Sequence, residues 1–202
     1  MKSFIGAVIF ICVAFSANAQ LLWKVSGNGL TQPSYIIGTH HLAPFSIMDS
    51  IAGLQKAMNE TQQVYGELKM SEMQSPATMG KMQKAMMIES DTTLTSLLSP
   101  EDFETANKFC KENLKKLTNA YMKQDLNTMF KISEERKGNQ CDALPSEEDA
   151  LIYNRNKIWA EKLPAIMKAA PTFVAVGALH LPGEKGLLKL LKSQGYTIEP
   201  VK

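Results

Sequence analysis

Residues 171–201 read PTFVAVGALHLPGEKGLLKLLKSQGYTIEPV and carry the clearest structural pattern in the chain. The apolar run 173–177 is typical of a buried strand, and the leucine-rich segment 187–191 is typical of a helix. Gly195 follows as a helix-ending glycine, and residues 196–201 have the composition of another strand. The carboxyl-terminal region therefore predicts a β-α-β unit.

The amino-terminal third carries further strand patterns. Residues 21–25 and 34–37 are separated by the glycine-rich segment 26–29, which predicts a β-hairpin. Residues 46–60 predict one amphipathic helix, because apolar side chains recur there at three- and four-residue spacing. Residues 63–68 read as a buried strand. The expected order in this third is strand, strand, helix, strand.

The middle of the chain, from about Ser71 to Lys137, is rich in Met and Lys and has helical periodicity. We expect this region to be mostly helical. Methionines recur there at helical spacing, for example Met79 and Met82. This pattern favours adaptable core packing, and the alternative is a pliable binding surface.

The first nineteen residues have the pattern of a secretory signal peptide. Lys2 provides the positive start, residues 4–15 are apolar, and residues 17–19 (ANA) form a cleavage site. The apolar run is shorter than the roughly 20 residues of a membrane-spanning helix, although an uncleaved anchor is the alternative. We predict an exported protein of the periplasm or cell envelope, with one domain over residues 20–202 and no membrane span after cleavage.

The charge balance indicates the class of partner, and the cysteine content indicates whether a disulfide can form. The chain has 22 Lys and Arg residues and 20 Asp and Glu residues, and loss of Lys2 would leave 21 basic residues. This balance argues against a nucleic acid or an anionic membrane surface and favours a peptide or a small-molecule substrate. Cys110 and Cys141 would remain in an oxidising compartment, where they either pair or stay as two free thiols.

All three histidines lie in two Gly-x-x-His motifs, at residues 38–41 and 177–180, and each motif follows a predicted strand. Ligands gather at the carboxyl ends of strands in α/β sheets, and glycine there permits positive φ and close approach. Glu67 ends a third strand pattern. We therefore expect His41, His180 and Glu67 to share one cleft and to bind a divalent transition metal, with open positions for water and substrate.

Each of these residues also has a purely structural interpretation. A histidine after a strand is often a hydrogen-bonded cap, and Glu67 alone would be an ordinary strand-end carboxylate. His40 is expected to support its neighbours rather than to bind metal. Arg155, beside Asn156, either holds a substrate carboxylate or oxyanion or pairs on the surface with one of Glu147, Glu148 and Asp149.

These residues together resemble the TraB/GumN family, which is related to the Tiki metalloproteases. The resemblance covers about residues 21–110 and 116–202. It rests on LWKV (22–25), SYIIGTHH (34–41), YGEL (65–68), YNRN (153–156) and GALHLPGEKG (177–186). It implies an α/β fold with a mixed central sheet and a helical middle insertion. In this fold the β-hairpin lies at the amino-terminal end and the β-α-β unit at the carboxyl-terminal end.

The resemblance also implies a metal-dependent, peptidase-like site. Carried onto this chain, the metal ligands are His41, His180 and Glu67, and the metal is Mn, Co or Zn. Arg155 and Asn156 are the matching polar pair, with Glu67 as ligand or general base and Arg155 steadying the substrate or an oxyanion. We expect a hydrolase of the bacterial cell envelope. The alternatives are a non-catalytic envelope peptide-binding protein and a hydrolase of non-peptide esters or amides.

One departure from the family concerns the middle of the chain. Members of the family have a middle region that is longer by several tens of residues, with a Gly-Leu-Glu-Thr type segment that this sequence lacks. We place the junction near Lys111 to Leu117. If the missing piece supplies a strand or a carboxylate, this chain keeps the motifs but lacks part of the sheet or of the catalytic set.

Overall fold

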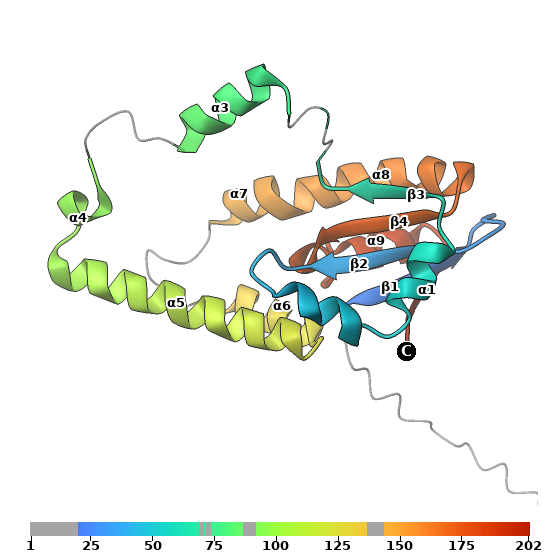
Figure 1. The fold of residues 1–202 in the computed structure, drawn as a ribbon, viewed down its shortest axis with the longest axis horizontal. Helices are drawn as coiled ribbons and strands as arrows, with labels where there is room; N and C mark the ends of the chain where they lie inside the picture. The colour runs from blue at the N-terminus through green and yellow to red at the C-terminus, as the bar shows by residue number, and fades with distance from the viewer. Residues whose placement is uncertain (1–19, 69–70, 72–73, 87–91, 137–143) are drawn as a thin grey trace, which may run out of the picture.

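The computed structural model describes residues 20–68, 71, 74–86, 92–136 and 144–202 (Figure 1). In this part of the chain, five strands form one sheet in the order β3-β4-β2-β1-β5. The strands are β1 (Leu22–Gly27), β2 (Ser34–Thr39), β3 (Gln63–Gly66), β4 (Thr172–Gly177) and β5 (Tyr196–Pro200).

Helices precede, follow and connect these strands. The first third contributes the 3-10 helix η1 (Phe45–Ser50) and α1 (Leu54–Asn59). The middle contributes α3 (Pro76–Met86), α4 (Leu94–Leu97), α5 (Pro100–Met122) and α6 (Leu126–Glu134). The last third contributes α7 (Pro145–Glu148), the π-helix η2 (Asp149–Tyr153), α8 (Asn154–Ala169), the 3-10 helix η3 (Ala178–His180) and α9 (Leu187–Ser193). The α/β class with a helical middle is confirmed.

The sheet is mixed. β1 and β2 form the expected antiparallel hairpin, and β4 runs parallel to both β2 and β3. β5 follows β4 and α9, but it pairs antiparallel with β1 on the far edge. The carboxyl-terminal β-α-β unit therefore forms as predicted, with β2 and β1 lying between its two strands.

The two faces of the sheet are covered differently. Figure 1 shows α8 and α9 behind the sheet and η1 and α1 in front of it. Ile36, Val174 and Val176 alternate with the front-facing residues along β2 and β4 and are almost completely buried. On the front face η1 and α1 cover only part of the central strands, and this partial cover leaves a groove that is described below.

The single helix expected over residues 46–60 is wrong, because the chain forms η1 and α1 with a break between them. Gly53 lies at φ +71° in the left-handed region, and a Cβ atom there would lie 2.5 Å from Val201 Cγ1. The break lies at the left-handed backbone of Gly53, which apolar periodicity does not reveal. Met58, one of the apolar side chains in this pattern, is 44% exposed.

Two further expectations about burial are also wrong. β3 is an edge strand rather than a buried one, and Val64 on it is 75% exposed. Met79 and Met82 are 60% and 42% exposed, so they do not pack into the core. Edge position and solvent exposure are tertiary properties, and an apolar run alone cannot report them.

Some sequence predictions concern residues that the structure does not describe. The predicted signal peptide, residues 1–19, lies outside the described residues, as does Cys141. Cys110 is an exposed free thiol. Among the helices of the described segments, none has the length and apolarity that a bilayer crossing requires.

Candidate active site

Three parallel strands end at one edge of the sheet. β2 and β3 both pair with β4, and the registers place Thr39 opposite Gly177 and Gly66 opposite Ala175. The segments that follow these strands carry His41, His180 and Glu67. The three residues therefore leave the sheet from neighbouring strand ends, as the sequence predicts.

These strand ends surround a cavity of about 280 Å³. Its lining includes His41, Glu67, Arg155 and His180, which are four of the five residues predicted for the site. The fifth, Asn156, is completely buried and contacts His180. The other lining residues are Thr39, His40, Leu117, Met129, Ile152, Gly177, Ala178 and Leu179.

Both carboxylate oxygens of Glu67 accept hydrogen bonds. The Gly177 backbone N–H donates to Oε1, and the Arg155 guanidinium donates to Oε2 over 2.7 Å. Burial raises the pKa of Glu67, but the donors Gly177 and Arg155 together outweigh burial and hold that pKa below its ordinary value. Glu67 is therefore a carboxylate at neutral pH.

Arg155 is fixed from two sides. It forms its ion pair with Glu67, not with the acidic run 147–149, so the expected surface alternative is wrong. Its guanidinium also lies 4.8 Å from the ring centroid of Trp159, four residues later on α8. Arg155 thus presents a positioned charge at the wall of the cavity.

His180 is held by the Asn156 amide. The amide nitrogen of Asn156 donates to the carbonyl oxygens of His180 and Lys185, which orients its oxygen toward His180 Nδ1 at 2.8 Å. Because that oxygen can only accept, we assign the ring proton to Nδ1. Burial lowers the pKa of His180, Glu67 raises it and Arg155 lowers it, with a net lowering. The neutral ring then carries its lone pair on Nε2.

The open nitrogen of His180 and the carboxylate of Glu67 lie close together. His180 Nε2 is 3.9 Å from Glu67 Oε1, and neither atom can donate a hydrogen bond to the other in these protonation states. Two donors on one transition metal, at roughly 2.0–2.2 Å each, lie roughly 3.0–3.5 Å apart. The donor types fit such an ion, and their separation is slightly wider than bound ligands require.

His41 and His40 have different surroundings. His41 is exposed and lines the cavity. His40 Nε2 lies 3.0 Å from Thr118 Oγ1, and its ring centroid lies 5.4 Å from that of Tyr121. His40 thus joins the loop after β2 to α5, as expected of a supporting residue. Among the residues with described positions, no three His, Cys, Asp or Glu side chains are grouped closely enough to chelate a metal.

The two motif glycines act through close approach of neighbouring atoms rather than through positive φ. Neither Gly38 nor Gly177 belongs to the positive-φ residues. A Cβ atom on Gly38 would lie 3.0 Å from Ala178 Cα, and one on Gly177 would lie 3.1 Å from Glu67 Oε1. Gly177 therefore lets the Glu67 carboxylate reach the backbone.

Sequence reasoning missed two parts of this arrangement. The Gly177 N–H that anchors Glu67 carries no sequence signal, because any residue has a backbone donor. Trp159 packs 4.7 Å from the His180 ring, centroid to centroid, and also faces Arg155. The four-residue spacing of Arg155 and Trp159 on a predicted helix was the available signal for this contact.

A family model matches this chain over almost its whole described length. The model of the TraB/PrgY/gumN family matches residues 21–116 and 111–200, and this match confirms the resemblance carried by the sequence motifs. The two matched segments meet at residues 111–116, where the junction of the shortened middle is expected. No curated protein and no solved structure matches the chain.

Proposed function

We propose that this chain, which belongs to the TraB/PrgY/gumN family, is a metal-dependent hydrolase with peptidase-like chemistry. The observation that carries the proposal is the separation of 3.9 Å between His180 Nε2 and Glu67 Oε1. Hydrogen bonds from His180 to Asn156 and from Arg155 to Glu67 fix the two side chains. A location in the periplasm or cell envelope is part of the proposal and rests on the signal-peptide pattern.

His180 and Glu67 are the first two metal ligands in this proposal. A metal-bound histidine usually donates its other ring N–H to an oxygen, as His180 Nδ1 does to Asn156. His41 is the third ligand in this proposal, since it is exposed and lines the same cavity. A divalent ion such as Mn, Co or Zn at this place would supply a Lewis acid that activates water.

The surroundings of Glu67 favour a ligand over a general base. A general base works best when its pKa lies near the working pH, whereas Gly177 and Arg155 hold the pKa of Glu67 below its ordinary value. Both oxygens also already accept a hydrogen bond. Glu67 therefore contributes negative charge to the site rather than proton transfer.

Arg155 orients Glu67 and also supplies positive charge at the cavity wall. A guanidinium has five N–H donors, and its bond to Glu67 uses only part of that capacity. The remaining donors can steady a substrate carbonyl or an oxyanion that develops during hydrolysis. Asn156 is a positioning residue, because it is buried and acts on His180 alone among the proposed ligands.

Metal analysis of the purified protein tests the proposal. We expect a bound transition metal, and we expect the double variant His41→Ala/His180→Ala to lose it. The matched control is His40→Asn, which changes a histidine of the same loop without removing a proposed ligand. Metal content that stays the same in the double variant would overturn the proposal.

Peptide cleavage provides the second arm of this experiment. Incubation of a peptide library with the protein and added manganese, cobalt or zinc should give products detectable by mass spectrometry, and His180→Ala should abolish them. Peptide affinity without products would assign the chain to the non-catalytic binding proteins instead. Turnover of small esters or amides alone would assign it to the non-peptide hydrolases.

A further inference from the structure

An apolar groove of about 360 Å³ lies beside the candidate active site. Ile37 of β2 and Ala175 of β4 line its floor, and Phe45, Met48 and Met58 line its rim. The floor belongs to the front face of the sheet, which η1 and α1 cover only in part. Ligand pockets run from roughly 300 to 1,000 Å³, so this groove has room for a small group.

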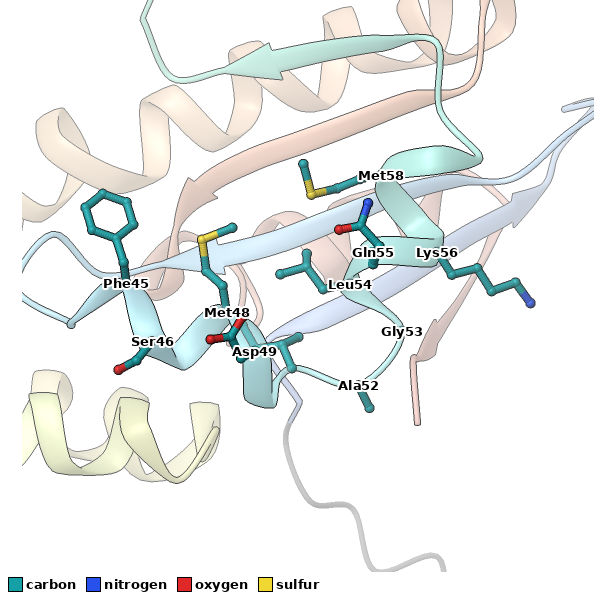
Figure 2. A pocket seen from close by; sticks show the side chains of 11 residues that line it. Phe45, Ser46, Met48, Asp49, Ala52, Gly53, Leu54, Gln55, Lys56 and Met58 are labelled. Carbon is teal, nitrogen blue, oxygen red and sulfur yellow. The ribbon is translucent and has the colours of Figure 1, made fainter.

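The rim consists of large apolar side chains with unusual exposure. Phe45 is 90% exposed, Met48 is 43% exposed and Met58 is 44% exposed. Figure 2 shows Phe45 and Met48 rising from η1 and Met58 extending from α1 in their direction, while Ala52 and Lys56 point away. A cluster of exposed large apolar groups is more informative than a single one, and methionine adapts its shape to a ligand.

The groove and the candidate active site adjoin each other. Thr39, His40 and His41 line both the groove and the cavity that contains Glu67 and His180. A substrate with its reacting bond at His180 therefore reaches the groove by extending past His41. Among the described residues, His40 and His41 line the groove but no Lys, Arg, Asp or Glu does, which favours an uncharged occupant.

We propose that this groove is the substrate subsite for a bulky apolar side chain, aromatic or long aliphatic, next to the bond that is hydrolysed. The proposal rests on the proposed function for the reaction, but its binding step does not need turnover. The substrate class is accordingly a peptide with an apolar residue beside the scissile bond.

Methionine methyl NMR tests the binding step without catalysis. The protein carries His180→Ala to prevent turnover, and the probes are N-acetyl-phenylalanine amide and N-acetyl-serine amide. The phenylalanine probe should shift the methyl signals of Met48 and Met58 and leave those of Met79 and Met82 unchanged. Equal shifts with both probes, or no shift of Met48 and Met58 up to the solubility limit, would overturn the subsite.

Cleavage specificity tests the subsite in the wild-type protein. Among library peptides, those with an apolar residue beside the cleaved bond should have a kcat/KM at least about tenfold higher than those with serine there, mainly through KM. Phe45→Ala should remove most of this preference, and so should Ala175→Phe, which fills the floor. The matched controls are Leu97→Ala, a 64% exposed side chain on α4, and Ala52→Phe.

The two arms separate the subsite from the reaction. Selective methyl shifts without any hydrolysis support the groove as a binding site and count against the proposed function alone. Hydrolysis without a preference that Phe45→Ala can reduce overturns the subsite alone. Because Phe45 is almost fully exposed, its replacement leaves the fold intact even if Ala175→Phe does not fold.

Discussion

Glu67 and His180 owe their chemical state to neighbours that are distant in the sequence. The donors to Glu67 are Arg155 and the N–H of Gly177, and His180 is oriented by Asn156. The proximity of His41, His180 and Glu67 in one cavity could be predicted, because each residue follows a strand pattern and parallel strands end at the same edge of a sheet. Their charge and tautomer could not, since these depend on contacts that only the folded chain creates.

Asn156→Ala should weaken metal binding by roughly 10- to 100-fold, the usual effect of removing the partner that orients a metal-binding histidine. It should also lower the free energy of unfolding by about 1–3 kcal/mol, because the buried carbonyl oxygen and ring N–H of His180 lose their partner. Isothermal titration with zinc and urea unfolding measure the two effects. The exposed neighbour Asn154→Ala is the control, and equal behaviour of the two variants would contradict the role of Asn156.

The secondary-structure elements were predictable to different degrees. The hairpin and β4 were predictable because their apolar runs and turn residues are local signals. The place of β5 beside β1 was not, because strand order is a long-range property. The break between η1 and α1 was missed because the spacing of apolar residues does not report the left-handed backbone of Gly53.

α6 provides an element-scale prediction. Asp125 caps this helix by accepting hydrogen bonds from the Thr128 hydroxyl and N–H, which hold the pKa of Asp125 below its ordinary value. Asp125→Ala should lower the free energy of unfolding by about 1 kcal/mol at pH 7. A depressed carboxyl pKa stabilises the fold above the unfolded value near 3.8, and this contribution is lost as pH falls through the folded value.

Urea unfolding at two pH values measures this effect. One is pH 7, and the other lies below the pKa of Asp125 in both the folded and the unfolded chain. The difference between wild type and Asp125→Ala should shrink at the lower pH, and Asp125→Asn should retain most of the cap at both. A difference that is the same at both pH values would contradict the contribution of the carboxylate.

At the scale of the whole molecule, strands from the amino-terminal and carboxyl-terminal regions form one sheet. Helix α5 of the middle region contacts this sheet through Tyr121. α5 runs unbroken from Pro100 to Met122, so the expected junction at residues 111–117 lies inside one helix. At the end of this junction Leu117 lines the candidate cavity, and one turn later the Tyr121 hydroxyl donates to the Gly38 carbonyl. The shortened middle therefore still reaches the first Gly-x-x-His motif.

X-ray absorption spectroscopy of the protein loaded with cobalt or zinc tests the proposed metal site most directly. The proposed ligands His41, His180 and Glu67 predict an ion with imidazole nitrogen and carboxylate oxygen in its first coordination shell. His180→Ala should reduce the imidazole scattering from that shell, because His41 then remains as the single proposed imidazole ligand. A shell without imidazole nitrogen, or one that His180→Ala and His41→Ala leave unchanged, would contradict the metal site.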